Sequence, residues 1–284
     1  MSHILVVDDD RTTRYVLQNV LNGAGFSTSV AKDGVEALKA LRAERYDLLL
    51  LDVWMPRMNG LDLLAKLRTR KNRPRVLVMT SDDTPETVLK AVREQAFKYV
   101  HKPVDSAALL DTIREVLESS VPPRIEVVSA RPEWVELVVP CTREAVEHLQ
   151  SVMAHLDANL APDVRESIAY AFRELVLNAV EWGGRLDPNR TVRIACLRSK
   201  RMLMYRIADP GTGFNIDDLP HAAIGQPAET PIAHSQVREE KGLRPGGFGL
   251  LTVRATVDEL LYNEKRNEVV FVKYLDPPTD AAPR

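Results

Sequence analysis

The chain has 284 residues, of which 45% are apolar and 27% charged, and its formal net charge at pH 7 is −2. This length suffices for two domains with separate cores, and the near-neutral charge excludes a general electrostatic attraction to nucleic acid or membranes. No apolar run is long enough to span a bilayer, and the N-terminus enters a predicted strand at once instead of a signal peptide. Cys141 and Cys196 are isolated, so neither a disulfide framework nor a zinc site is expected, and a reducing cytoplasm is the expected location.

Residues 1–120 alternate short apolar runs with helical patterns, which predicts a parallel sheet wrapped by helices. The predicted strands are His3–Val7, Phe26–Val30, Asp47–Leu51, Arg75–Thr80 and Lys98–Val100, and the predicted helices are Thr12–Leu21, Gly34–Arg42, Leu61–Leu67, Pro85–Glu94 and Ser106–Glu118. Leu48–Leu51 is apolar at every position, as expected for a central strand covered on both faces. The first domain is therefore predicted to consist of five βα units.

Two adjacent prolines, Pro122 and Pro123, end this pattern, and residues 121–133 are predicted to be a linker and the entry to a second domain. Within residues 134–276 the predicted strands are Trp134–Val139, Val192–Leu197, Met202–Ala208, Glu259–Tyr262 and Glu268–Tyr274, and the predicted helices are Thr142–Leu156, Pro162–Trp182 and Gly249–Thr256. Strands on one side and helices on the other indicate an α+β sandwich. Residues 277–284 are predicted to be a frayed tail.

Polar side chains end the predicted parallel strands of the first domain, at the edge where open α/β sheets place their sites. They are Asp8 and Asp9 after the first strand, Asp52 after the third, Thr80 at the end of the fourth and Lys102 after the fifth. Three converging carboxylates repel each other unless a cation neutralises them, and Mg²⁺ suits such an oxygen-rich site. Asp52 can then be the nucleophile that forms an acyl phosphate, while Lys102 and the Thr80 hydroxyl stabilise the phosphoryl oxygens.

These motifs resemble the receiver domains of response regulators over about the first 118 residues. The resemblance is carried by Ile4–Asp9, Asp52 with Met55–Pro56 and Asn59–Gly60, Thr80–Ser81, and Lys102–Pro103. It implies a flavodoxin-like (βα)5 fold with the strand order 2-1-3-4-5. It also implies that Asp52 accepts a phosphoryl group from an upstream histidine kinase or another phosphodonor.

The same resemblance implies a magnesium site at Asp52. Asp9 would bind the ion directly, Asp8 would bind mainly through water, and the backbone carbonyl of Trp54 would complete the site. Tyr99 matches the aromatic residue whose rotation follows movement of the threonine. Taken singly, an Asp pair after a strand is often only a helix cap, so the order of all these features along the chain is what favours the site.

One predicted helix of the second domain carries Glu174 and Asn178, which are four residues apart and therefore share one face. Such a pair can hold a hydrated Mg²⁺ through Asn178 and orient a hydroxyl group through Glu174. Asp209, Gly211 and Gly213 follow directly after a predicted strand. The Asp209 carboxylate can accept a hydrogen bond from an exocyclic amine such as that of adenine, and the glycines allow the backbone to approach the ring.

A second glycine motif, Gly246-Gly247-Phe248-Gly249, lies where a loop enters the last predicted helix, so its N–H groups can bind phosphates. The segment between the two glycine motifs is too long for an ordinary loop and is predicted to be a functional lid. Three basic residues lie near its phosphate end: Arg238, Lys241 and Arg244.

These features resemble the Bergerat-type ATP-binding fold that histidine kinases, gyrase-like ATPases and anti-sigma-factor kinases share, over about residues 125–275. Glu174–Asn178 resembles its N box, Asp209–Gly213 its first glycine box and Gly247–Leu250 its second. The resemblance implies ATP and Mg²⁺ as cofactors, with Asn178 on the metal and Asp209 on adenine. The residues that would contact the rest of the nucleotide are Gly211, Gly213, Gly247 and Gly249.

The kind of kinase is indicated by what precedes the N box. A histidine kinase would carry its phospho-accepting histidine on a helical hairpin, whereas His148 and His155 lie on one short predicted helix without acidic and proline neighbours. Glu174 favours a hydroxyl acceptor, because a carboxylate can take the proton of serine or threonine. The opening strand and two long helices resemble the anti-sigma-factor serine kinases, which implies a small anti-sigma antagonist, a sigma factor, or both as partners.

The combined prediction is a two-component response regulator whose aspartate phosphorylation controls an ATP-dependent serine/threonine kinase, and through partner switching controls transcription. Two alternatives stay open: an ATP-gated module that sequesters a sigma factor with little catalysis, and an atypical phosphorelay histidine kinase hybrid. A homodimer is compatible with the sequence, and neither direct binding of nucleic acid nor membrane association is expected. The sign of the regulation does not follow from the residues.

Overall fold

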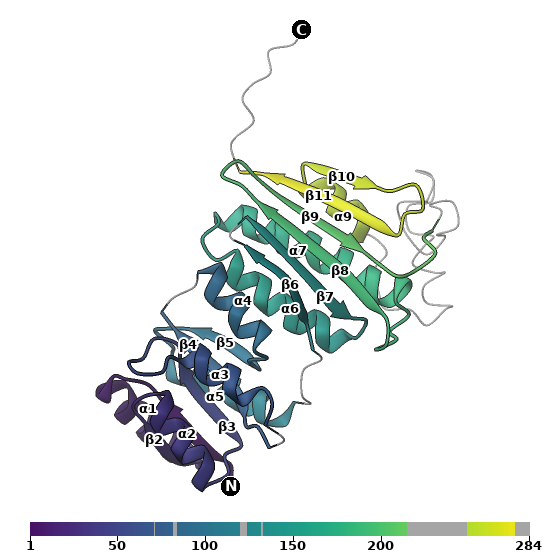
Figure 1. Ribbon diagram of the computed structural model, residues 1–284. Coiled ribbons are helices and arrows are strands. Elements are labelled where there is room, and N and C mark those ends of the chain that lie inside the picture. Colours follow the sequence, from purple (N-terminus) through teal and green to yellow (C-terminus); the bar gives the residue numbers. More distant parts are fainter. Residues whose placement is uncertain (71, 82–83, 120–123, 132, 215–248, 276–284) are drawn as a thin grey trace. The chain divides into compact units, whose positions relative to one another are not determined.

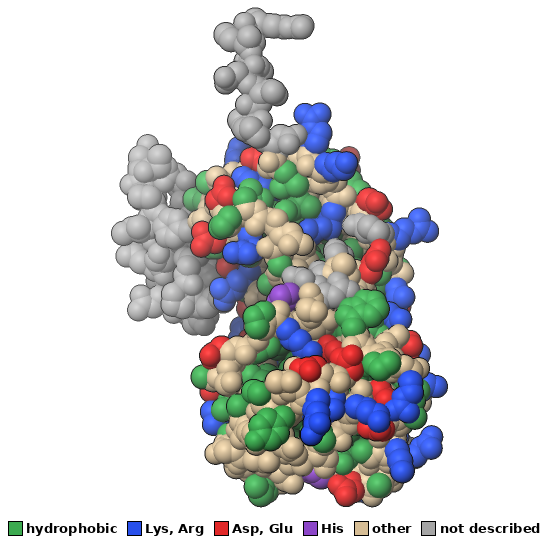
Figure 2. Space-filling model, turned by 90° about the vertical axis from the view of Figure 1, so that its left-hand side faces the viewer, with side chains coloured by type: hydrophobic (Ala, Val, Ile, Leu, Met, Phe, Trp, Pro, Cys, Tyr) green, Lys and Arg blue, Asp and Glu red, His purple; other side chains and the backbone are tan. Residues whose placement is uncertain are grey.

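The computed structural model describes residues 1–70, 72–81, 84–119, 124–131, 133–214 and 249–275, which fall into two compact units divided between Arg124 and Ile125 (Figure 1). Within these ranges, no helix combines the length and the apolar character that a membrane span requires. On the face shown in Figure 2, basic and acidic side chains are interspersed, in keeping with the near-neutral charge of the sequence.

The first unit is a five-stranded parallel sheet with the strand order β2-β1-β3-β4-β5. Its strands are β1 (His3–Val7), β2 (Ser27–Ala31), β3 (Leu48–Asp52), β4 (Arg75–Thr80) and β5 (Lys98–His101), and its helices are α1 (Arg11–Gly23), α2 (Gly34–Ala43), α3 (Gly60–Leu67), α4 (Pro85–Arg93) and α5 (Ser106–Glu118). The flavodoxin-like fold and its strand order are thus confirmed, with element ends that shift by one or two residues.

Burial explains why β3 lies at the centre of this sheet. All five of its residues are buried, so the strand is covered on both faces. Leu48 and Leu50 pack with Ile113 of α5 in one cluster, and the alternate residues Leu49 and Leu51 on the other face are also fully buried. The strand therefore carries its last residue, Asp52, to the carboxyl edge of a rigid, two-sided core.

Gly60 allows the loop after β3 to fold back onto that strand. Its N–H donates to the carbonyl of Val53 at 2.8 Å, and a methyl group added at Gly60 would lie 2.1 Å from the backbone oxygen of Asp52. Backbone cannot yield as a flexible side chain can, so close packing at this point requires glycine.

We expect Gly60→Ala to destabilise the first unit by about 1–3 kcal/mol, the usual cost of forcing an extra carbon into a packed site. Hydrogen exchange of the β3 amides in the intact chain measures this change. Gly23→Ala is the matched control, because a methyl group there meets no atom within 4 Å. Equal protection of β3 in both variants would contradict the prediction.

The second unit is a six-stranded antiparallel sheet with the order β10-β11-β9-β8-β7-β6. Its strands are β6 (Glu126–Arg131), β7 (Trp134–Pro140), β8 (Thr191–Arg198), β9 (Met202–Ala208), β10 (Glu259–Tyr262) and β11 (Glu268–Tyr274), and its helices are α6 (Arg143–Leu156), α7 (Pro162–Asn178), the π-helical turn η1 (Ala179–Gly183) and α9 (Gly249–Thr256). The predicted sandwich of a sheet and helices is confirmed.

One face of this sheet packs against the helices (Figure 1). Alternate residues of β7 and β9 are buried, which is the period expected of a strand covered on one side. At the centre, the ring of Tyr205 stacks on Phe271 with centroids 4.8 Å apart and meets Phe172 of α7 edge-on at 5.5 Å. This aromatic core holds α7 in a fixed position against the sheet.

Strand β6 lies within residues 121–133, the predicted linker and domain entry, where no strand was predicted. It pairs with β7 at the edge of the sheet and contains an irregularity between Val127 and Ser129. Its polar residues and broken alternation hide the period-two signal of a strand. The predicted helix Pro162–Trp182 is corrected in its last turn, which widens into η1.

Candidate functional site

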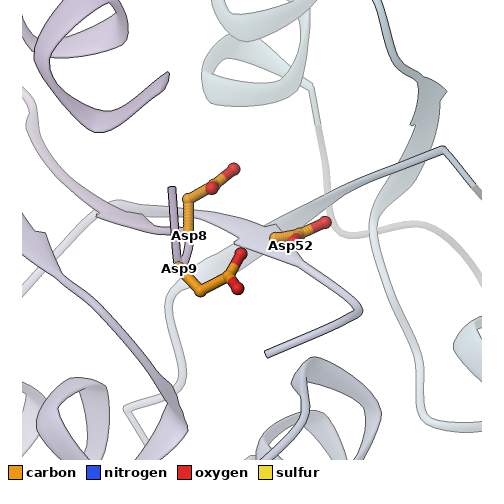
Figure 3. Close-up of side chains that lie close together, drawn as sticks. All are labelled: Asp8, Asp9 and Asp52. Atoms are coloured by element: carbon orange, nitrogen blue, oxygen red, sulfur yellow. The ribbon is translucent and has the colours of Figure 1, made fainter. Parts of the chain in front are cut away.

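The first candidate site lies at the carboxyl edge of the parallel sheet. Asp8 and Asp9 follow β1 and Asp52 ends β3, and one ligand oxygen from each lies within 4.8 Å of the others (Figure 3). Asp8 and Asp52 are 1% and 6% exposed, whereas Asp9 is exposed. Within the described residues, these three aspartates form a cluster whose side chains lie close enough together to share one metal ion.

Lys102 joins two of these carboxylates. Its Nζ lies 2.6 Å from Oδ2 of Asp8 and 3.0 Å from Oδ1 of Asp52. Burial raises the pKa of Asp52, and the hydrogen bond and charge of Lys102 offset part of that increase. Burial alone would lower the pKa of Lys102, but its contacts with both carboxylates outweigh burial and raise it. The lysine is therefore charged at neutral pH.

Backbone pairing brings Thr80 to the same edge. Asp52 pairs with Met79 across β3 and β4, so Thr80 lies one residue beyond, and its carbonyl accepts a hydrogen bond from the Lys102 N–H at 2.8 Å. Thr80 is fully buried, and Tyr99 on β5 is 7% exposed. Trp54, whose backbone carbonyl is the predicted further metal ligand, lies in the loop after β3 with its side chain 58% exposed.

The chemistry of this site fits a hard cation. Carboxylate oxygens are the ligands that Mg²⁺ prefers, and here one exposed and two buried carboxylates supply them. The arrangement can also hold an anionic group against the Lys102 ammonium. The predicted residues Asp8, Asp9, Asp52 and Lys102 are thus brought together.

The second candidate site runs along α7 and its π-helical extension. Glu174 faces the start of α9, since a methyl group added at Gly249 would lie 2.3 Å from its Oε2 atom. Asn178 ends α7 one turn later, where η1 begins. Glu174 is thereby placed beside Gly249 of the second glycine motif, where the sequence predicts phosphate binding.

Asp209 lies at the other end of the second candidate site, beside Gly183 of η1. Its Oδ1 accepts a hydrogen bond from the Gly211 N–H at 2.7 Å, and a methyl group added at Gly183 would lie 2.2 Å from its Cγ and Oδ1. Burial raises the pKa of Asp209, and the Gly211 N–H and the charge of Arg190 offset part of that increase. The carboxylate is held in place by backbone, with its remaining acceptor capacity available to a ligand.

The first glycine box is fixed by a close backbone contact. Gly213 adopts a φ of +83°, and a methyl group there would lie 1.5 Å from the carbonyl oxygen of Lys265. Asn267, before β11, donates from Nδ2 to the carbonyl of Gly211 at 3.2 Å. Glycine is therefore required at position 213 by both its dihedral angle and the space around it.

Gly249 and Leu250 are the described part of the second glycine box. Gly246, Gly247 and Phe248 and the predicted lid with Arg238, Lys241 and Arg244 lie outside the described residues. Gly183 was not predicted as a site residue, although the pair Gly183-Gly184 directly after a helix could have signalled a close contact. From Glu174 to Gly183 the helix is about 13 Å long, so Gly249 and Asp209 mark two separated ends of one candidate nucleotide site.

Comparison with known families agrees with this division. The model of the response regulator receiver domain matches residues 4–114, and the model of the histidine kinase-like ATPase domain matches residues 139–273. The two models together cover both candidate sites, including Asp52 in the first and Asn178 in the second.

Among individual proteins, this chain is similar to response regulators and receiver domains. The DNA-binding response regulator MtrA of Mycolicibacterium paratuberculosis is 34% identical over 182 residues, which are 64% of this chain and 80% of that protein. The response regulator MprA of Mycobacterium avium is 39% identical over 119 residues, or 42% of this chain and 52% of that protein. A CheY-like receiver domain protein from Methanospirillum hungatei has 28% identity and a TM-score of 0.41, covering 42% of this chain and 94% of that chain.

Proposed function

Because the chain belongs to the response regulators and joins a receiver domain to a histidine kinase-like ATPase domain, we propose that phosphorylation of Asp52 controls an ATP-dependent serine/threonine kinase. The observation that supports the kinase part is the position of Glu174 beside Gly249 of the second glycine motif. An upstream histidine kinase or a small acyl phosphate would supply the phosphoryl group of Asp52.

In the receiver domain, a carboxylate oxygen of Asp52 attacks the phosphorus atom of the donor, and the bond from phosphorus to the donor breaks. Asp8, Asp9, Asp52 and the backbone carbonyl of Trp54 would hold Mg²⁺, which supplies charge neutralisation when bound. Lys102 would stabilise the negative charge on the transferred oxygens, and the Thr80 hydroxyl would donate a hydrogen bond to one of them. The contacts of Lys102 with Asp8 and Asp52 support these roles.

In the ATPase domain, Asp209 would accept a hydrogen bond from the adenine amino group. Gly211, Gly213, Gly247 and Gly249 would line the nucleotide, and Asn178 would bind the Mg²⁺ that accompanies its phosphates. The hydrogen bond from Gly211 to Asp209 and the contact of Gly183 with its carboxyl group support the adenine role, because they fix the acceptor before a ligand arrives.

Glu174 would act as the general base. Its carboxylate lies beside Gly249, and a hydroxyl group of the acceptor protein would lose its proton to Glu174 as it attacks the terminal phosphate. The neighbouring Asn178 is one helical turn away and would orient the leaving phosphates. Serine or threonine is the acceptor that such a base serves, since a neutral imidazole nucleophile needs no deprotonation to attack.

The histidines of α6 do not favour a histidine kinase mechanism. His155 is partly buried, and its Nδ1 atom lies 2.7 Å from the carbonyl oxygen of Ser151 on the same helix. His148 is also partly buried on this single 14-residue helix. A phospho-accepting histidine needs a free ring nitrogen on a surface that the ATP domain can reach, and α6 lies packed against α7.

The acceptor we propose is a small anti-sigma-factor antagonist, with a sigma factor as the partner in the other state. The assay combines the intact chain, Mg²⁺, γ-labelled ATP and an antagonist protein from the same genome. Acid-stable label on the antagonist is the expected result. Acid-labile label would replace the proposal with a phosphorelay mechanism, and nucleotide binding without any transfer would replace it with a sequestering module.

Control by the receiver is tested in the same assay with and without acetyl phosphate. We expect acetyl phosphate to change the rate of label transfer in the wild type but not in Asp52→Asn. An identical rate in all four mixtures would contradict the proposed coupling of the two domains.

A further inference from the structure

An ion pair between a buried carboxylate, Asp33, and a half-exposed guanidinium, Arg57, joins the start of α2 to the loop that follows the proposed phospho-acceptor. The Asp33 carboxylate is 1% exposed. Its Oδ1 caps α2 by accepting hydrogen bonds from the N–H groups of Val35 and Glu36 at 2.9 and 3.0 Å. Its Oδ2 accepts hydrogen bonds from Nε of Arg57 at 2.7 Å and from Nη2 of the same guanidinium.

Arg57 adopts a conformation that is unfavourable for an L-residue. Its φ is +65°, in the left-handed region, where the cost of a side chain has to be offset by surrounding contacts. The guanidinium contact with Asp33 is one such contact, and Nη2 also lies 3.6 Å from Oε1 of Glu36. The hydrogen bonds and the charge of Arg57 act with the N–H groups of α2 against burial, so the pKa of Asp33 is lowered overall.

A second contact beside the ion pair fixes the same loop to α2. The Gly34 N–H donates to the carbonyl of Met58 at 3.2 Å, and a methyl group added at Gly34 would lie 2.7 Å from Cγ of Met58. The loop is also closed on itself, since the Met58 N–H donates to the carbonyl of Pro56 at 2.7 Å. The loop of residues 53–59 is therefore held in two places. Arg57 and Met58 contact the start of α2, and Gly60, directly after the loop, packs against the end of β3.

We propose that Arg57 and Asp33 are positioning residues for the metal site of the receiver domain. The loop that they hold begins directly after Asp52 and contains Trp54, so the ion pair fixes the direction in which the Trp54 carbonyl faces the site. The inference rests on the proposed function of Asp52. It goes beyond that function by assigning a role to two residues that contact neither the metal nor the phosphoryl group.

The test measures metal binding without any chemistry. Free Mn²⁺ is followed by electron paramagnetic resonance during titration of the intact, nucleotide-free chain. Arg57→Met removes the charge but keeps a long side chain, and we expect it to weaken Mn²⁺ binding about tenfold, the lower end for residues that support metal ligands. Asp33→Asn leaves an oxygen for the α2 cap, breaks the ion pair and is expected to have a similar effect.

Two further variants are controls. Arg57→Lys keeps the positive charge but loses the two-donor contact of the guanidinium with Asp33, and it is expected to bind Mn²⁺ less tightly than the wild type but more tightly than Arg57→Met. Arg68→Ala removes another half-exposed arginine of the same unit, paired with Glu94 at 3.7 Å, and is expected to change nothing. The rate of phosphoryl uptake from acetyl phosphate should return to nearly the wild-type value in Arg57→Met once Mg²⁺ is saturating, because only positioning has been lost.

Wild-type binding in Arg57→Met would overturn the inference, as would a loss of equal size in Arg57→Lys. If Arg57→Met fails to fold, as judged by circular dichroism, the Asp33→Asn titration decides in the same way. Failure of the proposed function looks different: the wild type itself would then take up no phosphoryl group, and Asp52→Asn would leave its Mn²⁺ binding unchanged.

Discussion

Replacement of Asp52 by asparagine is expected to abolish phosphoryl uptake by the receiver domain, with a loss of at least about 10³-fold because the nucleophile itself is removed. An amide oxygen cannot form the acyl phosphate, whereas the remaining carboxylates and Lys102 stay in place. Labelling with an acyl-phosphate donor, read on the intact chain, measures the change. ATP binding by the second domain is expected to be unaffected.

The matched control is Asp111→Asn, which neutralises a carboxylate that is 77% exposed on α5. It should take up label at the wild-type rate. Label on Asp52→Asn at more than a small fraction of the wild-type level would place the phosphoryl group on another residue of the cluster, and the assignment of Asp52 would then be wrong.

The same variant has an expected effect on stability, with a defined sign. The pKa of Asp52 is raised in the folded chain, so ionisation of this carboxyl group disfavours folding above that pKa. The wild type therefore loses stability as pH rises through the folded pKa, and Asp52→Asn avoids that loss. Thermal unfolding should show the variant to be at least as stable as the wild type at pH 7, with a smaller difference at pH 4.

Replacement of Glu174 by glutamine is expected to leave ATP bound and to slow phosphoryl transfer by about 10²–10⁴-fold, the contribution of a positioned general base. Glutamine retains the shape of the side chain beside Gly249 but cannot accept the proton of the attacking hydroxyl group. Nucleotide binding is followed by titration with a fluorescent ATP analogue, and transfer by acid-stable label on the antagonist protein.

Glu166→Gln provides the comparison for this variant, since Glu166 is an exposed carboxylate on the same helix, two turns before Glu174. It is expected to transfer phosphate normally. Transfer at the wild-type rate by Glu174→Gln would show that this residue is not the base. Loss of ATP binding in that variant would instead assign Glu174 to the nucleotide site.

The receiver site was largely predictable because its residues follow from strand order alone. In a parallel sheet, residues that end neighbouring strands meet at one edge, so Asp8, Asp52 and Lys102 could be brought together from their positions in sequence. The ion pair of Asp33 and Arg57 could not be predicted, because Asp33 has the pattern of an ordinary helix cap and nothing in the sequence signals the left-handed φ of Arg57.

In the second domain, the elements could be predicted but their local irregularities could not. Strand β6 lacks a continuous apolar alternation because it lies at an edge, and the π-helical turn after Asn178 has no periodicity of its own in five residues. The contact of Glu174 with Gly249 joins positions 75 residues apart, so it depends on how α9 packs against α7. Such a contact follows from tertiary structure and not from either motif.

The contact of Lys102 with Asp8 and Asp52 has an electrical consequence. Three carboxylates and one ammonium group give the pocket a net charge of −2, so a single divalent cation makes it neutral. Conversion of a carboxylate to an acyl phosphate adds a charge of about −1, because the acyl group of this mixed anhydride is neutral while the phosphoryl group carries about −2. The unmodified pocket is then balanced and the modified pocket is not, which gives the surrounding loops a reason to rearrange only after transfer.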